Sequence, residues 1–418
     1  MLTKSSQHTQ IDGVQLLNER RGLTSLKNAK SVNDSAHQSP MYAVTENENR
    51  RDGRRILSID GGGVRCVITM EVLFTLEQKL RKLYGHRTTL SDHFDLVVGT
   101  SAGGMLAAGV AAGIPMTDIR EFVMKTVKSM FTRSPWYRRH RSLYCKQHLK
   151  QGLIDQLGAN NTLGSTRLKT GLMLPMRNWT LDSEWLLTNF AGAAPDGDVD
   201  DSHLDLHLWE LALASAAAPA YYRPEKIVYG RRQPRQYILD DGGMTGSLNP
   251  AFRAFLFATR AISGPQWSVG DEQLTIVSLG SGEAPIIRGS CDRKIHVINA
   301  ILQMPNAMLQ ASIREQENLC RYFGHVVSDD TVDAVFNIRS EKLFRYHRLN
   351  PKLTTPGLAA LGFPELSARA VMPMDAGHNL EILSDIGKVY AERQIGPVID
   401  EFCLINALPA ASGYTNRN

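Results

Sequence analysis

The sequence predicts an α/β fold with a mainly parallel sheet, and two observations carry this prediction. Apolar, strand-like runs alternate with helical stretches: the run 56–59 precedes a helix expected over 65–84, and the run 94–98 precedes one expected over 102–112. Alternating units of this kind give parallel strands with helices on both faces of the sheet. The second observation is a glycine-rich turn between each of these strands and its helix.

The first glycine-rich turn is the run 60–63 (DGGG), with Arg65 close behind it. Three successive glycines let backbone N–H groups turn toward an anion with no side chain in the way. The anion is either the oxyanion of an acyl-transfer reaction or a phosphate. A dinucleotide-binding GxGxxG is excluded because Cys66 occupies the last position, and no GK[ST] follows, which excludes a P-loop.

The second turn is a GxSxG, in which Gly99 and Gly103 flank Ser101. A serine held in a sharp strand-to-helix turn needs small neighbours, because a Cβ at either flank would clash with the adjoining element. Such a turn lifts the hydroxyl clear of the sheet and places it at the N-terminus of the next helix, whose dipole favours negative charge. Taken alone, the pattern also fits an ordinary strand-to-helix corner.

The third turn holds Asp240 and Asp241, followed by Gly242 and Gly243, and it comes after the strand-like run 236–239. An Asp-Gly pair is also an ordinary turn signal. The third turn matters because of the serine in the second turn: a nucleophilic serine at such a strand-to-helix turn needs a base to accept its proton. A carboxylate at a strand end can accept the serine proton within hydrogen-bond reach.

In this order, the three turns resemble those of the patatin-like phospholipase family, over about residues 54–325. The resemblance implies a three-layer α/β/α core with a mainly parallel sheet. It implies that Ser101 is the nucleophile and that Asp241, directly before the two glycines, is its base in a Ser–Asp dyad. The stretches 208–222 and 275–282 resemble the family's Ala-rich helix and late core strand.

The same resemblance implies that Gly61, Gly62 and Gly63 form the oxyanion hole, with Arg65 beside them. Cys66 departs from the family, which usually has glycine at this position. Because cysteine is small, we expect the loop to survive the change. The implied activity is that of a phospholipase A type lipid acyl hydrolase, which cleaves fatty acyl esters of phospholipids or other acyl lipids. The resemblance implies no metal and no cofactor.

Composition predicts the organisation of the 418-residue chain, of which 43% is hydrophobic. We expect a flexible segment over 1–53, a catalytic core over 54–285, a mainly helical C-terminal part over 286–407 packed on the core, and a polar tail over 408–418. The first 50 residues lack an apolar signal-peptide region, and the five cysteines form no paired framework. These features favour a cytoplasmic location, and an uncleaved secretion signal in 1–50 stays open.

Charge is unevenly distributed along the chain, whose net charge is +5. The segment 122–154 contains no acidic residue but eight lysines and arginines, with Trp136, Tyr137 and Tyr144 among them. Such a segment can lie peripherally on an anionic phospholipid surface, or it can be an ordinary solvated face. No nucleic-acid-binding module accompanies it, so no nucleic-acid partner is expected. The sequence leaves the oligomeric state open.

Other constellations predict no site. Cys145 and His148 are spaced like half a zinc site without a second pair. The acidic run 196–201 does not match a calcium loop, because Asp201 occupies the position of its glycine and His207 that of its final glutamate. His347 and His378 follow the aspartate in the order of a Ser-Asp-His triad, and we expect both at the surface.

Residues 96–117 carry no charge, and a buried strand, turn and helix explain them better than a bilayer helix. Two alternatives to a simple hydrolase remain. One is a phospholipase effector, in a toxin or in antiphage defence, that a partner or second messenger activates. The other is a non-catalytic scaffold, against which the intact Ser101 and Asp241 count.

Overall fold

The computed structural model describes residues 53–130, 132–135, 137, 142–195, 201–260, 264–283, 297–327, 341–375 and 377–404. All of them belong to the second of the two units into which the chain divides, Tyr42–Asn418. The expected flexible segment, apart from its last residue, and the expected polar tail lie outside the described residues.

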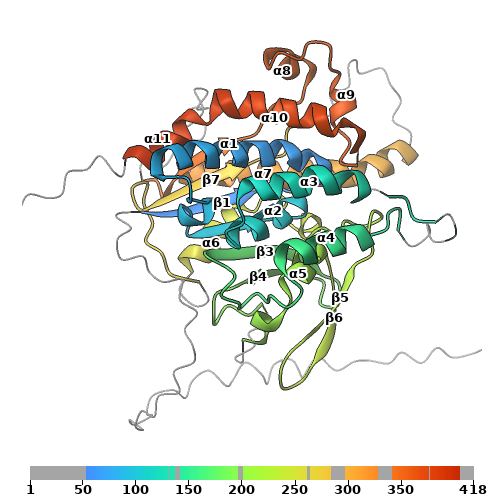
Figure 1. The fold of residues 1–418 in the computed structure, drawn as a ribbon. Helices are drawn as coiled ribbons and strands as arrows, with labels where there is room; N and C mark the ends of the chain where they lie inside the picture. The colour runs from blue at the N-terminus through green and yellow to red at the C-terminus, as the bar shows by residue number, and fades with distance from the viewer. Residues whose placement is uncertain are drawn as a thin grey trace, which may run out of the picture. The chain divides into compact units, whose positions relative to one another are not determined.

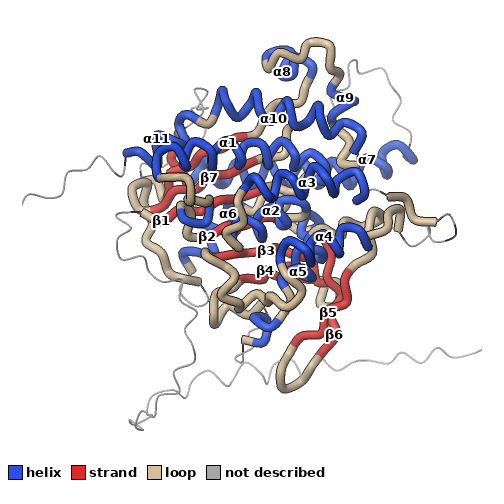
Figure 2. Tube along the Cα trace, viewed as in Figure 1, coloured by secondary structure: helices blue, strands red, loops and turns tan. Residues whose placement is uncertain are grey.

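One mixed sheet organises the described residues, and its central strands are parallel (Figures 1 and 2). The strands are β1 (Arg54–Ile59), β2 (Leu96–Gly99), β3 (Gly171–Asn178), β4 (Ser183–Thr188), β5 (Glu225–Tyr229), β6 (Arg235–Asp241), β7 (Leu274–Leu279), β8 (Gly324–Val326) and β9 (Phe344–Leu349). They pair in the order β5-β6-β3-β2-β1-β7-β9-β8, and β4 pairs with β3 off this path. The pairs β3–β4, β3–β6 and β5–β6 are antiparallel, and the other pairs are parallel. The predicted mainly parallel sheet is confirmed.

Helices cover both faces of this sheet, as predicted (Figure 1). They are α1 (Cys66–Tyr84), α2 (Ala102–Ala111), α3 (Met116–Met130), α4 (Gln147–Leu157), α5 (Leu208–Ser215), α6 (Ala251–Thr259), α7 (Val297–Phe323), α8 (Thr355–Ala360), α9 (Ala368–Val371), α10 (Leu380–Gln394) and α11 (Gly396–Leu404). Because side chains alternate along a strand, Leu57 joins the core beneath α1, α2 and α10, whereas Ile56 joins the core beneath α6 and α7.

The C-terminal part is mainly helical, as predicted, and it also contributes two strands to the sheet. Its long helices are α7 and the pair α10 and α11, which are separated at Ile395. However, β9 lies in the sheet itself, parallel to β7, and β8 pairs with its outer edge. The sequence of β9, FRYHRL, mixes charges with aromatic residues and so lacks the apolar pattern of a buried strand. The C-terminal part therefore extends the sheet as well as covering it.

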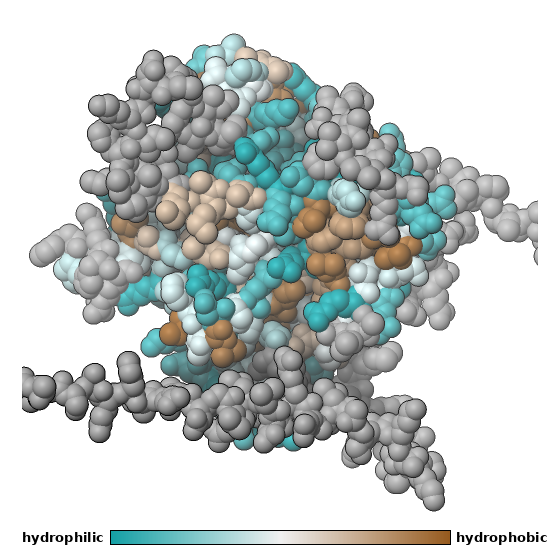
Figure 3. All heavy atoms as spheres, turned by 180° about the vertical axis from the view of Figure 1, so that it is seen from behind, coloured by the Kyte–Doolittle hydropathy of each residue, from teal (hydrophilic) through white to brown (hydrophobic). Residues whose placement is uncertain are grey.

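The uncharged stretch 96–117 folds as β2, a turn and α2, as predicted, and most of it is buried. Among the described residues, no helix combines the length and the apolar character that crossing a membrane requires. Apolar side chains do reach the surface in patches between polar ones (Figure 3). Met304 and Met308 of α7 are among the exposed large apolar residues.

Candidate active site

The turn after β2 has the strained geometry that its glycines predict. Ser101 adopts φ 58° and ψ −130°, a conformation that non-glycine residues rarely occupy and that concentrates at functional sites. A Cβ on Gly99 would lie 2.2 Å from the carbonyl oxygen of Gly103. A Cβ on Gly103 would lie 2.4 Å from the carbonyl oxygen of Asp60. Both positions therefore admit only glycine, and Ser101 is held at the start of α2.

Ser101 and Asp241 meet directly. The Ser101 hydroxyl donates a hydrogen bond of 2.6 Å to Oδ2 of Asp241, the last residue of β6. The other carboxylate oxygen accepts a 2.7 Å hydrogen bond from the N–H of Gly243, inside the turn that Gly242 opens. A Cβ on Gly242 would lie 2.3 Å from the carbonyl oxygen of Pro175, so this turn also requires glycine. One carboxylate oxygen is therefore held by the turn, and the other is held against the Ser101 hydroxyl.

The environment of Asp241 suits a proton acceptor. Burial raises the pKa of this carboxyl to about 7, while the hydrogen bonds from Ser101 and Gly243 oppose the rise. Asp240 follows the alternation of the strand and turns away: its carboxylate accepts a hydrogen bond from the indole N–H of Trp179. Of the two aspartates, only Asp241 contacts the serine.

The glycine loop, residues 61–63, runs beside the serine. A Cβ on Gly61 would lie 3.1 Å from the Cβ of Ser101. The N–H of Gly61 donates to the carbonyl oxygen of Leu248 at 2.9 Å. The N–H groups of Gly62 and Gly63 donate to no other described residue, so these two are left for a ligand.

Neighbouring groups enclose the glycine loop closely. A Cβ on Gly62 would lie 2.0 Å from Oγ of Ser281, and one on Gly63, whose φ is +59°, would lie 2.3 Å from the carbonyl oxygen of Met374. The same Met374 carbonyl accepts a 2.8 Å hydrogen bond from the N–H of Val64. Met374 belongs to the C-terminal part, which therefore contributes directly to this site.

Arg65 and Cys66 follow the glycine loop, and both are buried. The Arg65 side chain is buried and donates to the carbonyl oxygen of Gly282 at 3.3 Å, so it supports the loop that follows β7. The Cys66 thiol is buried and donates to the carbonyl oxygen of Asp60 at 3.5 Å. Burial raises the pKa of this thiol to about 12, which keeps it protonated and unreactive. The site therefore accommodates cysteine where glycine is usual.

An apolar pocket opens from Ser101 and Asp241. Helices α1, α2, α3 and α7, with the turn after α5, supply most of its walls. Its larger apolar and aromatic lining residues are Val64, Val67, Met105, Leu106, Ile119, Phe122, Val123, Val127, Met130, Leu149, Tyr221, Tyr222, Met244, Leu248, Leu309 and Met374. Among the described residues that line the pocket, Asp241 is the only charged one and none is a histidine.

Two further serines hydrogen-bond to the site, and the sequence did not predict this role for either of them. Ser215 of α5 accepts a 3.1 Å hydrogen bond from the N–H of Ser101 and so braces the elbow. Ser281, in the glycine- and serine-rich stretch after β7, donates a 2.9 Å hydrogen bond to the carbonyl oxygen of Gly61. The motif around Ser281 is visible in the sequence, but nothing local tells that it faces the glycine loop.

None of the histidines that the structure describes lines the pocket. His347 was expected at the surface, and this expectation is wrong: it is fully buried in β9, with Nε2 3.3 Å from a carboxylate oxygen of Glu401. The reason is the unforeseen place of β9 inside the sheet. His378 is exposed, as predicted. Across the described ranges, no group of three or more His, Cys, Asp or Glu side chains is placed to hold a metal ion.

The structure covers only part of the basic segment 122–154. Trp136 and the arginines at 138, 139 and 141 lie outside the described residues, as do residues 196–200 of the acidic run. Tyr137 is exposed, whereas Tyr144 is buried and donates a 2.7 Å hydrogen bond to Asp375. Tyr144 therefore serves packing rather than an outer surface.

A family comparison agrees with this geometry. Residues 57–255 match the model of the family described as patatin-like phospholipase. The match contains the glycine loop, the elbow serine and Asp241. Residues 57–255, just under half of the chain, therefore match a patatin-like phospholipase domain.

Individual relatives agree with this assignment. The chain is 28% identical over 233 residues to a cGAMP-activated phospholipase of Escherichia coli, covering 54% of this chain and 62% of that protein. It is 31% identical over 231 residues to patatin-like protein 2 of Arabidopsis thaliana, covering 50% and 53%. The chain thus spans little more than half the length of these relatives. VipD from Legionella pneumophila is a similar solved structure, with a TM-score of 0.37, 14% identity, and 80% and 67% of the two chains covered.

Proposed function

We propose that this protein is a lipid acyl hydrolase of the phospholipase A type that works through a Ser101–Asp241 dyad. The observation that carries the proposal is the 2.6 Å hydrogen bond from the Ser101 hydroxyl to a buried carboxylate, at the floor of an apolar pocket. A carboxylate whose pKa is about 7 is matched to proton transfer near neutral pH. The pocket lining suits a fatty acyl chain.

The proposed reaction has two halves. Asp241 accepts the Ser101 proton as Oγ attacks the ester carbonyl carbon, and the N–H groups of Gly62 and Gly63 stabilise the oxyanion. The tetrahedral intermediate then expels the alcohol, which takes the proton from Asp241. A water molecule attacks the acyl-serine ester and gives its proton to Asp241. Collapse returns a proton to Ser101 and releases the fatty acid.

Activation by a second messenger is a second candidate, which one comparison favours. A relative at 28% identity is a cGAMP-activated phospholipase, and we carry this feature to the present chain only as a proposal. It shares the chemistry of the simple hydrolase and differs in what the reaction requires. A hydrolase that needs an activator would be inactive alone and active after a cyclic dinucleotide or a cell extract is added.

One assay separates these candidates. Purified protein is incubated with phosphatidylcholine or phosphatidylglycerol vesicles, alone, with cGAMP and with extract, and released fatty acid is measured. Release by the protein alone supports the simple hydrolase, and release only with an addition supports the activated form. If no condition gives release above that of Ser101→Ala, the proposed function fails.

We further propose a cytoplasmic protein that contacts membranes peripherally through the segment 122–154. Support comes from the sequence of that segment and from its place in the fold. Phe122, Val123 and Val127 of α3 line the apolar pocket, while Lys125 on the same helix is exposed. A bilayer bound at this side would lie near the route by which an acyl chain enters.

A further inference from the structure

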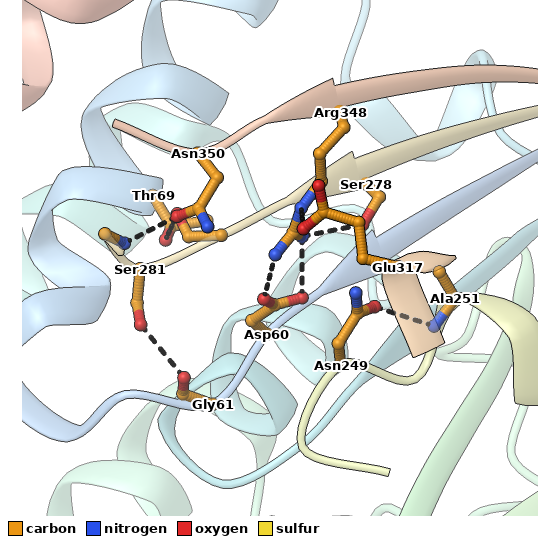
Figure 4. Close-up of polar contacts among 12 residues, drawn as sticks. Asp60, Gly61, Thr69, Asn249, Ala251, Ser278, Ser281, Glu317, Arg348 and Asn350 are labelled. Atoms are coloured by element: carbon orange, nitrogen blue, oxygen red, sulfur yellow. Dashed lines mark hydrogen bonds and ion pairs between the residues drawn. The ribbon is translucent and has the colours of Figure 1, made fainter. Parts of the chain in front are cut away.

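A buried arginine from the C-terminal part forms an ion pair with Asp60, the residue that precedes the glycine loop. Arg348 of β9 is almost fully buried, and its guanidinium faces the carboxylate of Asp60 with both ends (Figure 4). The distances are 2.7 Å from Nη2 to Oδ2 and 3.0 Å from Nη1 to Oδ1. Two parallel N–H···O bonds of this kind fix position as well as charge.

The guanidinium is itself held from two further directions. Nη1 also donates to Oγ of Ser278 in β7 at 2.8 Å, and Nε donates to Glu317 of α7 at 3.3 Å. Glu317 in turn accepts from Arg321 one helical turn along at 2.9 Å. Burial opposes the charge on Arg348, but Asp60, Tyr346 and Glu317 together outweigh this effect and hold the pKa of Arg348 above its ordinary value. Arg348 is therefore a charged, immobile anchor.

Asp60 transmits this anchorage to the site. It directly follows β1 and precedes Gly61, so its position sets where the glycine loop leaves the sheet. Its N–H donates to the carbonyl oxygen of Leu279 at 2.9 Å, and its own carbonyl lies against Gly103 of the elbow. A shift of Asp60 would displace the N–H groups of Gly62 and Gly63 relative to Ser101.

We propose that Arg348 is a positioning residue, which holds the oxyanion-binding glycine loop in its active geometry through Asp60. The inference rests on the proposed function. It also makes the C-terminal part an integral component of the site, since Arg348 and Glu317 lie outside the matched family domain at 57–255. Oxyanion donors act on the transition state more than on the bound substrate, so a displaced loop lowers kcat more than it changes KM.

The test compares two arginines of the same strand in the full chain. Arg348→Met is the test variant. Arg345→Met is the matched control, because Arg345 also pairs with a carboxylate, Glu401, at 3.2 Å, but on the opposite face of the sheet. Each protein is assayed well below its own melting temperature with a soluble p-nitrophenyl ester. A fluorophosphonate, whose phosphoryl oxygen occupies the oxyanion position, labels Ser101 in parallel.

For Arg348→Met we expect kcat and the labelling rate to fall at least about tenfold, with KM within about twofold of the parent. Arg348→Lys should recover part of the loss, since lysine restores the charge without the two-ended grip. Arg345→Met should lower the melting temperature and leave kcat unchanged. If Arg348→Met does not fold, Asp60→Asn takes its place with the same expected loss.

A folded Arg348→Met or Asp60→Asn protein with the kcat and labelling rate of the parent would overturn the inference. An equal loss of kcat in Arg345→Met would overturn it as well, because general loosening of the sheet would then explain both. A parent protein that neither cleaves the ester nor reacts with the fluorophosphonate, whether alone, with cGAMP or with cell extract, would instead contradict the proposed function, and the inference with it.

Discussion

The Ser101 hydroxyl lies 2.6 Å from the carboxylate of Asp241, although 140 residues separate the two in the sequence. The sheet brings them together. Ser101 follows β2, β3 pairs with β2, and β6 runs antiparallel to β3 with Asp241 opposite Met176. The contact is direct, so a proton can pass from serine to carboxylate without an imidazole between them.

The pH dependence of catalysis should report the titration of Asp241. Its carboxyl must be ionised to accept the serine proton, and burial raises its pKa to about 7. We therefore expect kcat/KM to fall about tenfold for each pH unit below 7 and to level off above it. A soluble ester measured between pH 4 and pH 9 provides the profile. A plateau that extends down to pH 5 would contradict the assignment of Asp241 as the base.

Asp241→Asn should remove most activity yet stabilise the fold in a pH-dependent way. Because the folded pKa of Asp241, about 7, lies above its ordinary value of 3.8, folding favours the protonated form. The stability penalty of the ionised group is absent below pH 3.8 and grows as the pH rises to about 7. The melting temperature of the variant should exceed that of the parent by more at pH 8 than at pH 4. An equal difference in melting temperature at both pH values would show that ionisation of Asp241 does not destabilise the folded protein.

His347→Ala should destabilise the protein without removing activity. The imidazole is buried and contacts Glu401. Burial opposes ionisation of Glu401, but His347 and Arg345 favour it more strongly, so the pKa of Glu401 falls to about 2. Loss of this partner should cost about 1–3 kcal/mol of unfolding free energy, measured by denaturant titration, with kcat unchanged. His378→Ala, at an exposed position, is the control and should change neither quantity. A His347→Ala protein as inactive as the serine variant would favour a triad.

The sequence predicted the parts of the site that depend on local backbone geometry. Gly99, Gly103 and Gly242 each lie where a Cβ would collide with a carbonyl oxygen of a neighbouring element, and such a constraint is visible as a motif. The alternation of apolar strands and helices likewise predicted the central sheet, because burial of both faces imposes it. The pairing of Ser101 with Asp241 came from the resemblance to a family rather than from spacing.

The remaining features depend on contacts between distant segments. No pattern in the sequence marks Arg348 or Glu317 as buried, yet each is paired with a residue far away along the chain. For the same reason β9 escaped prediction, since its charged side chains are paired inside the protein. Met374 covers the glycine loop from a segment with no regular pattern of its own. Local sequence carries no signal for such contacts.

Membrane contact should depend on salt and on the basic segment 122–154. We expect Arg138→Gln, Arg139→Gln and Arg141→Gln, combined in one protein, to weaken binding to anionic liposomes, at about 1 kcal/mol for each charge removed. Binding of the parent should also weaken as ionic strength rises. Sedimentation with anionic and neutral liposomes measures this, and soluble-ester turnover should persist in the triple variant. Liposome binding equal to that of the parent would identify the segment as an ordinary solvated face.

The most direct test of the central claim is hydrolysis by Ser101→Ala. The flanking glycines, not the hydroxyl, permit the turn, so this variant should keep the melting temperature of the parent to within a few degrees. Ser183→Ala, at the start of β4, is the matched control and should retain full activity. Under the condition that activates the parent, Ser101→Ala should release no fatty acid from phospholipid and no p-nitrophenol from a soluble ester. Activity of folded Ser101→Ala comparable to that of the parent would contradict the Ser101–Asp241 dyad.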